Sequence, residues 1–291
     1  MNAKSSIQLS VCICTRDRVS SLVRALESCA AQRDALHEVV VADDSTAPST
    51  RETVERDFPW VRWVPGPQRG LGPNRNAAIS AATGSHVLFL DDDAMLGPDC
   101  LTTAFAALEA AGDLHLHRTV VTGTEVKDGL RVAPNNLGFF GHQTRPYRPG
   151  EPYKTVVINA TVWPRSLFDR VRFDEKLRFG SDEVDISTQA VAQGYRIVFA
   201  PDAVNIHAQD PGGRETYEFQ ADVSRLFVTG KRLLFVQPRP LRALAFLVVA
   251  PLHLIGAAVK RDGVAGIGQA LKVLRAWAQY ARADLRQRRR A

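Results

Sequence analysis

Acidic residues gather directly after two apolar runs, and their spacing points to metal or phosphate chemistry. They are Asp43 and Asp44, after the run at 38–42, and Asp91, Asp92 and Asp93, after the run at 87–90. Neighbouring carboxylates repel one another, so solvent or a cation must hold them together. Divalent cations such as Mg²⁺ and Mn²⁺ prefer oxygen ligands, often one or two carboxylates plus substrate phosphates. Taken alone, the three consecutive aspartates at 91–93 are equally well explained as an acidic turn. Together with the aspartates at 43–44, and with Arg75 between the two groups, they favour a binding site for a cation or a phosphate.

A second acidic segment runs from Gly180 to Asp185 and opens a helical pattern. Acids at a helix N-terminus stabilise the helix dipole, and Ser181 or Asp182 suits the N-cap, so a purely structural role competes with chemistry. In the functional interpretation one of these carboxylates is a general base. His207 follows a further apolar run, where it is either a structural histidine or part of the site. Arg214, in the charged loop predicted at 209–216, is placed to close over an anion.

The elements that must position these residues read as an α/β domain. Apolar runs at 7–14, 38–42, 60–64, 87–90 and 196–200 predict strands, and helical spacing predicts helices at 19–31, 51–57, 76–82, 98–111 and 183–194. Strands alternating with helices through short loops indicate a mostly parallel, Rossmann-like sheet with flanking helices. Ligands of such sheets bind outside the carboxyl ends of the strands, which is where the acidic residues stand.

Charge and cysteine content narrow the function classes. Residues 241–291 hold ten Lys/Arg and two Asp, a net of +8, which leaves 27 basic and 29 acidic side chains, a net of −2, in residues 1–240. The acidic body argues against nucleic acid as a partner. The four cysteines form no C-x-x-C motif and no cluster with histidine, so we expect buried, reduced thiols in a cytoplasmic protein without zinc.

The last 53 residues, 239–291, are predicted as a separate basic helical tail after a domain at 1–238. Residues 243–259 carry no Asp, Glu, Lys or Arg, but Pro251 and His253 argue against a simple membrane span. An interfacial hairpin or a helix packed on the domain are the two interpretations. Residues 264–286 are amphipathic. The residues expected on the apolar face are Ile267, Leu271, Leu274, Ala278 and Leu285. This pattern suits the anionic surface of the inner face of the cytoplasmic membrane.

Taken in order, these motifs resemble the family 2 glycosyltransferases with the GT-A fold. The resemblance rests on Val11–Arg18, the run at 39–45, Gly72–Ile79, Leu88–Asp93, Gly180–Asp185 and His207, and it covers residues 7–235. One departure is that Asp182-Glu183 stands where the family usually has Glu then Asp. The resemblance therefore implies Glu183 as the catalytic base, with Asp182 as the alternative.

The resemblance also implies roles for the other matching positions. Thr15, Arg16, Asp43, Asp44, Arg75, Asp91, Asp92 and Arg214 would bind the nucleotide sugar, and Asp93 and His207 would ligate Mn²⁺ or Mg²⁺ on its pyrophosphate. The implied reaction is inverting transfer of a hexosyl or deoxyhexosyl group to an acceptor hydroxyl. Two acceptors are expected as alternatives: a lipid-linked saccharide, which suits the tail, and a small metabolite, which suits a soluble protein.

Two other functions compete with this interpretation. A sugar-nucleotide nucleotidylyltransferase would need a glycine-rich phosphate loop after the first strand, and residues 15–18 contain no glycine. A non-catalytic sugar- or partner-binding protein could keep the fold, but it would not need the complete acidic set.

Overall fold

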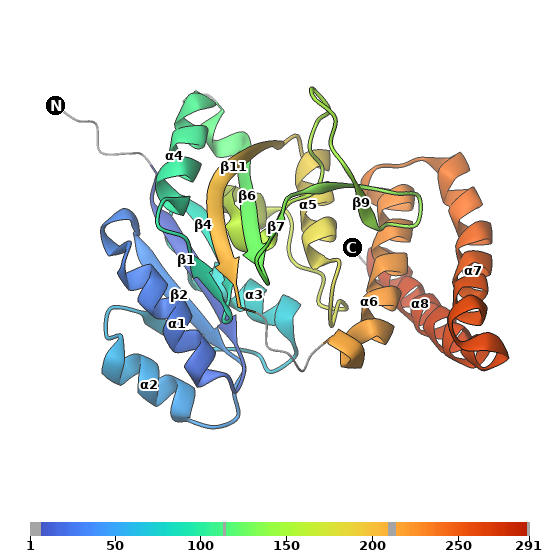
Figure 1. The fold of residues 1–291 in the computed structure, drawn as a ribbon, viewed down its shortest axis with the longest axis horizontal. Helices are drawn as coiled ribbons and strands as arrows, with labels where there is room; N and C mark the ends of the chain where they lie inside the picture. The colour runs from blue at the N-terminus through green and yellow to red at the C-terminus, as the bar shows by residue number, and fades with distance from the viewer. Residues whose placement is uncertain (1–6, 113–114, 209–213, 290–291) are drawn as a thin grey trace.

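The computed structural model describes residues 7–112, 115–208 and 214–289, which form a mixed β-sheet flanked by helices with three helices at one end (Figure 1). The first half of the sheet is parallel, in the order β3-β2-β1-β4. Its strands are β1 (Leu9–Thr15), β2 (Glu38–Asp43), β3 (Arg62–Pro65) and β4 (His86–Asp91). The connecting helices are α1 (Val19–Ala30), α2 (Ser49–Asp57) and α3 (Leu71–Ala81). The predicted α/β class is confirmed.

The second half of the sheet adds antiparallel pairs. It contains β5 (Ala94–Leu96), β6 (Thr119–Lys127), β7 (Leu130–Val132), β10 (Thr161–Pro164) and β11 (Arg196–His207), with α4 (Cys100–Ala110) and α5 (Asp182–Ala192) beside them. Strand β10 runs antiparallel to both β4 and β6, whereas β11 runs parallel to β6. Strand β11 is longer than the predicted strand at 196–200, and this extension carries His207 to the edge where β4 ends.

Alternation along β1 explains the two cores of the domain. Val11 and Ile13 face the cluster covered by α1, α2 and α4, whereas Cys12 and Cys14 face the cluster covered by α3 and α5. A strand buried on both faces reads as a continuous apolar run, which is why residues 7–14 gave a clear signal. All four cysteines are buried and free, as expected. Burial raises the pKa of Cys29 to about 12, which keeps that thiol protonated.

A small hairpin and a helical unit complete the chain. The hairpin pairs β8 (Asn135–Leu137) with β9 (Gln143–Pro146). The helices are α6 (Arg214–Lys231), α7 (Pro240–Asp262) and α8 (Gly266–Arg288), with a π-helical turn at Arg232–Val236. They share a core of their own, and Phe139 and Phe140 of the hairpin pack against it. Helix α6 ends before residue 238 but shares this core with α7 and α8. The domain boundary at residue 238 stays a prediction.

Two details of the tail bear on what the sequence predicted. Helix α7 continues through Pro251 without a break, because the proline removes only one backbone hydrogen bond from a helix held by packing on one side. On the predicted apolar face of α8, Leu271 and Leu285 are exposed, and the other three residues are partly buried. Val273 is buried and Trp277 is partly buried in the core of the helical unit.

One stretch of the tail is apolar enough to concern a membrane. Among the described residues, Pro240–Arg288 contains the one helical window long and apolar enough to cross a bilayer, judged by length and composition alone, and 22% of that window is buried. Helix α7 packs on the helical unit through residues such as Ala243, Phe246 and Ala250. Its opposite side is exposed.

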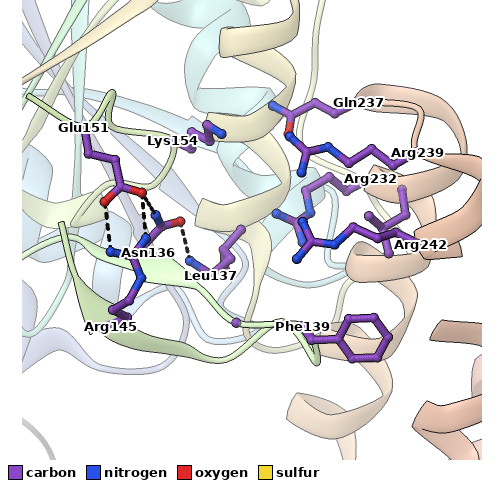
Figure 2. A pocket seen from close by; sticks show the side chains of 12 residues that line it. Asn136, Leu137, Phe139, Arg145, Glu151, Lys154, Arg232, Gln237, Arg239 and Arg242 are labelled. Carbon is purple, nitrogen blue, oxygen red and sulfur yellow. Dashed lines mark hydrogen bonds and ion pairs between the residues drawn. The ribbon is translucent and has the colours of Figure 1, made fainter. Parts of the chain in front are cut away.

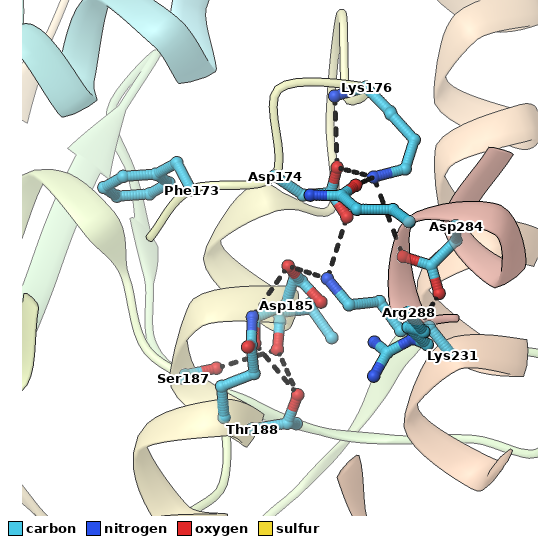
Figure 3. A network of polar contacts seen from close by, with 12 residues as sticks. Phe173, Asp174, Lys176, Asp185, Ser187, Thr188, Lys231, Asp284 and Arg288 are labelled. Carbon is cyan, nitrogen blue, oxygen red and sulfur yellow. Dashed lines mark hydrogen bonds and ion pairs between the residues drawn. The ribbon is translucent and has the colours of Figure 1, made fainter. Parts of the chain in front are cut away.

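A buried ionic network ties the helical unit to α5 (Figure 3). Lys231 Nζ, at the end of α6, donates to Asp174 Oδ2 at 2.9 Å and to Asp185 Oδ2 at 2.8 Å. Lys176 Nζ contacts Asp174 Oδ1 at 3.0 Å and Asp284 Oδ1 of α8 at 3.6 Å. Arg288 donates to the same Asp284 at 2.6 Å. Three helices and the loop before α5 are thereby fixed to one another.

Candidate functional site

A buried arginine organises the carboxylates at the end of β4. Arg75, on α3, is 2% exposed and donates from Nη2 to Asp91 Oδ1 at 2.8 Å and from Nη1 to Asp182 on α5. Asn159 donates to Asp91 Oδ2 at 3.1 Å. A buried guanidinium needs such partners, because an unpaired one would be very costly. Arg75 therefore joins two acidic segments that lie 91 positions apart in the chain.

The next two carboxylates of the triple share a second arginine. Arg18 donates from Nη1 to Asp92 Oδ1 at 2.8 Å and from Nη2 to Asp93 Oδ2 at 2.9 Å. Thr15 Oγ1 donates to Asp92 Oδ2 at 2.8 Å. Burial raises the pKa of Asp92 to about 7 even though Thr15 and Arg18 oppose this shift. Burial also raises the pKa of Asp93, but the hydrogen bonds from His207 and Arg18 bring it down to about 2.

His207 stands between two carboxylates at the end of β11. Its Nε2 lies 3.0 Å from Asp93 Oδ1, and its Nδ1 lies 2.8 Å from Glu125 Oε1 on β6. Burial lowers the pKa of His207, but these two carboxylates raise it to about 10. Asn159 donates to the same Glu125 oxygen at 2.8 Å. Glu125 thus fixes the orientation of the imidazole through Nδ1, the ring nitrogen that does not contact Asp93.

Ligand atoms of Asp91, Asp93 and His207 all lie within 4.8 Å of one another. Two carboxylate oxygens and one imidazole nitrogen form a donor set that a divalent cation such as Mn²⁺ accepts. The contact between Glu125 and Nδ1 is the kind of outer contact that orients metal-binding histidines. The residues present therefore fit a divalent metal. Asp91, predicted only for nucleotide binding, belongs to the same donor group.

Asp43 and Asp44, at the end of β2, shape the loop beside this cluster. Asp43 accepts hydrogen bonds from Trp63 Nε1 at 3.1 Å and from the Ser45 amide at 2.9 Å. Asp44 accepts from the backbone amides of Gln68 at 2.8 Å and Gly70 at 3.3 Å. Gly66 is required here, because a Cβ at this position would collide with Asp44 and with Asn74. These contacts hold the loop at 66–70 against the strand ends.

Glu183, in the first turn of α5, has an environment unlike that of its neighbour. Its Oε1 accepts one hydrogen bond, from Gln143 Nε2 of β9 at 2.9 Å. Burial and the nearby charge of Asp182 raise its pKa to about 7, against the hydrogen bond from Gln143 and the charge of Arg75. Asp182 is bound to Arg75 instead. A carboxyl group with this pKa exchanges a proton near neutral pH.

Most of the sequence-predicted residues converge at this edge of the sheet, and Arg16 does not. Arg16 is exposed and lies 3.7 Å from Asp17, because Asp17 has a φ of +55° and turns the chain after β1. That turn brings Arg18 to the acids in place of Arg16. Arg214 begins α6, but its side chain lies outside the described part of the structure, as do residues 209–213 of the predicted loop.

Four contributors were not predicted from the sequence. They are Arg18, Glu125, Gln143 and Asn159. Glu125 and Asn159 reach the site through the pairing of β6, β10 and β11, and Gln143 reaches it through the hairpin. Only Arg18 had a local signal, because it lies three residues beyond a strand end in a short polar turn.

An α/β sheet with carboxylates, an imidazole and arginines at its carboxyl edge is the arrangement that the GT-A class of fold predicts. The comparisons agree with this class. The profile of "Glycosyl transferase family 2" matches residues 10–161, and the chain belongs to that family.

Two proteins of Rhizobium meliloti are similar to this chain in sequence. It is 31% identical over 214 residues to the succinoglycan biosynthesis protein ExoO of Rhizobium meliloti, covering 64% of this chain and 56% of ExoO. It is 28% identical over 240 residues to ExoM of the same organism, covering 79% and 74% of the two chains. The chain thus spans little more than half of ExoO.

Two solved structures share the fold. TarS of S. aureus in complex with UDP-GlcNAc superposes with a TM-score of 0.65 at 18% identity, covering 94% of this chain and 81% of that one. The mannosyltransferase PcManGT of Pyrobaculum calidifontis, in complex with GDP-Man and Mn²⁺, gives a TM-score of 0.59 at 20% identity, covering 94% and 75%.

Proposed function

We propose that this protein transfers a sugar from a nucleotide-diphosphate sugar to a hydroxyl group of a saccharide acceptor, with inversion at the anomeric carbon. The observation that carries the proposal is the donor group of Asp91, Asp93 and His207 beside the raised-pKa carboxylate Glu183. The three-residue donor group suits a cation bound to phosphates, and Glu183 suits the removal of a proton from an acceptor hydroxyl. TarS in complex with UDP-GlcNAc and PcManGT in complex with GDP-Man share the fold, which supports this donor class.

On the donor side, each residue has a task that follows from its position. Asp93 and His207, with Asp91 beside them, would hold Mn²⁺ or Mg²⁺, and that ion would neutralise charge on the leaving diphosphate. Thr15 and Asp43, at the ends of neighbouring parallel strands, line the edge where a nucleoside would lie. Arg75 fixes Asp91 and Asp182 and adds positive charge to this edge.

On the acceptor side, Glu183 is proposed as the general base. An acceptor hydroxyl is a weak nucleophile near neutral pH, so a positioned carboxylate must take its proton as the glycosidic bond forms. Asp182 is bound to Arg75, whereas Glu183 makes no ion pair among the described residues. The oxygen of the acceptor would attack opposite the leaving diphosphate, and the configuration at the anomeric carbon inverts.

The test compares Asp93→Ala with a matched control. We expect Asp93→Ala to lose Mn²⁺-dependent binding of UDP or GDP and to lower sugar transfer by about 10³-fold or more, because the ion stabilises the departing charge. Asp99→Asn removes an exposed carboxylate outside the site and should behave like the unaltered protein. Binding is measured by calorimetry across a panel of nucleotide sugars with and without Mn²⁺. Full transfer by folded Asp93→Ala would refute the proposal.

We also propose that the outer side of α7 rests on an anionic membrane surface. Leu241 is 84% exposed and Leu252 is 65% exposed, and Leu244 and Val248 lie with them on one stripe of the helix. Basic residues flank the stripe, with Arg239 before it and Lys260 and Arg261 after it. An apolar stripe with basic flanks is the pattern of an interfacial helix.

Vesicle flotation tests this docking. The full chain should float with vesicles containing phosphatidylglycerol, and Leu244→Glu with Val248→Glu should abolish flotation without lowering the Tm, because both side chains are exposed. Flotation of the double variant equal to that of the unaltered protein would refute the docking surface.

A further inference from the structure

A pocket of about 340 Å³ lies between the β8–β9 hairpin and the start of α7, apart from the acidic site (Figure 2). Lys154, Arg232, Arg239 and Arg242 line it. In Figure 2 the three arginines come from the helical unit and Lys154 comes from the segment after the hairpin. The pocket is therefore built where two parts of the fold meet.

The pocket carries positive charge that the described residues do not neutralise. Its single carboxylate, Glu151, is already bound by Arg145 at 2.6 and 2.9 Å and by Asn136 at 2.6 Å. Among the described residues no carboxylate lies within 4.0 Å of the charged groups of Lys154, Arg232, Arg239 or Arg242. Besides the Arg145–Glu151 pair, four cations thus share one pocket, and like charges placed together repel one another.

Arg232 shows this mismatch most clearly. Its Nε is buried and has no hydrogen-bond partner among the described residues. Burial and the positive charges of Arg239 and Arg242 lower its pKa. The residue also begins the π-helical turn Arg232–Val236, a local distortion that proteins often keep at functional positions. A buried donor without a partner next to two more arginines is the arrangement that an anion completes.

The pocket is close to the proposed base through the hairpin. Leu137 lines the pocket, and its partner across the hairpin is Gln143, which donates to Glu183. On the other side, Arg239 and Arg242 flank Leu241, the first residue of the exposed apolar stripe of α7. A ligand in this pocket would lie beside the acceptor side of the site and at the edge of the proposed membrane-facing surface.

We propose that this pocket binds a phosphate or diphosphate group of the acceptor. Arginine binds phosphate oxygens through two parallel N–H donors, and three arginines with a lysine match the charge of a diphosphate. This inference rests on the proposed function, because it names the chemical class of the acceptor. Two sources share the chemistry: the head of a lipid-linked saccharide and a water-soluble sugar phosphate.

The experiment measures binding of inorganic pyrophosphate to the full chain by calorimetry in EDTA, so that the metal site does not contribute. Arg239→Gln with Arg242→Gln should weaken binding at least tenfold, and Arg232→Gln should do the same. The exposed pair Arg170→Gln with Arg196→Gln removes the same charge elsewhere and should leave the affinity unchanged. Since Arg239 and Arg242 are exposed, their replacement does not threaten folding.

Two further ligands distinguish the sources. Tighter binding of farnesyl diphosphate than of pyrophosphate, lost in the pocket variants, indicates a lipid-linked acceptor. Pocket-dependent binding of glucose 1-phosphate without any gain from the prenyl chain indicates a soluble one. Pyrophosphate that fails to bind, or that binds all variants equally, would overturn the inference.

Failure here is separable from failure of the proposed function. Mn²⁺-dependent UDP or GDP binding should survive in the pocket variants and be lost in Asp93→Ala, whereas Asp93→Ala should keep pyrophosphate binding in EDTA.

Discussion

Helix α5 contributes to two ionic clusters, and the two are built on opposite principles. Toward the helical unit, the carboxylates Asp174, Asp185 and Asp284 meet the cations Lys176, Lys231 and Arg288. Toward the sheet, six carboxylates gather, and the cations beside them among the described side chains are Arg18, Arg75 and His207; the carboxylates are those of Asp91, Asp92, Asp93, Glu125, Asp182 and Glu183. Within the described side chains, the first cluster is balanced, whereas the second keeps an excess of negative charge.

This difference separates a structural role from a chemical one. Burying charge is costly unless each ion is paired, so a balanced network can hold helices together but has no charge left for a ligand. The acidic cluster has carboxylates with pKa values near 7 and a donor group for a cation, so it gains most when a ligand supplies positive charge. Charge balance is thus a guide to which buried cluster is the site.

The largest expected effect is on the acidic side, in Glu183→Gln. This change keeps the shape but removes the proton acceptor, and we expect sugar transfer to fall by about 10³-fold. At pH 8 the variant should also unfold at a higher temperature, because a partly buried charge is lost. The two melting temperatures should nearly agree only at about pH 4, below the ordinary glutamate pKa of 4.5, because Glu183 is then mostly protonated in the unfolded chain as well as in the folded one.

Transfer assays and thermal melts at both pH values check this prediction. An active Glu183→Gln, or a lower melting temperature at pH 8, would place Glu183 among the structural acids instead.

The next effect is on the balanced side, in Lys231→Met. Removing this cation leaves Asp185 buried beside Asp174, and we expect a loss of about 3–5 kcal/mol in the free energy of unfolding. Adding Asp185→Leu should recover most of that loss, because the unpaired charge is gone. The exposed Lys272→Met serves as the control. Urea denaturation measures all three, and a change below about 1 kcal/mol in Lys231→Met would contradict the charge-balance argument.

The smallest effect is the pH dependence of transfer. Since the pKa of Glu183 is raised to about 7, the carboxylate is protonated and inactive below that pH. We expect kcat/KM to rise about tenfold per pH unit up to pH 7 and then level off. Gln143→Leu removes a hydrogen bond that lowers this pKa, so its profile should shift to higher pH. Profiles from pH 5.5 to 9 that coincide for the two proteins would exclude Glu183 as the titrating group.

The donor half of the site could be predicted from the sequence because its residues follow strand ends. The apolar runs before Asp43 and Asp91 fixed both the strands and the edge where their carboxylates meet. His207 was found for the same reason, since it ends β11. The resemblance to a known family then added the role of each position, which residue type and spacing alone did not give.

The remaining residues could not be predicted, because their positions depend on long-range pairing. Glu125 reaches His207 only because β6 lies beside β11, and Gln143 reaches Glu183 only because the hairpin folds over α5. The basic pocket likewise joins Lys154 to Arg232, which are far apart in the chain.

The double duty of α5 sets how this segment can change over evolution. Glu183 and Asp185 are two positions apart, so they point to different sides of one helical turn. A single inserted residue between them would rotate Asp185 by about 100° and shift it by about 1.5 Å relative to Glu183. If Glu183 kept its contact with Gln143, Asp185 would then lose its contact with Lys231. We therefore expect this helical turn to tolerate no insertion or deletion, even where individual side chains can be replaced.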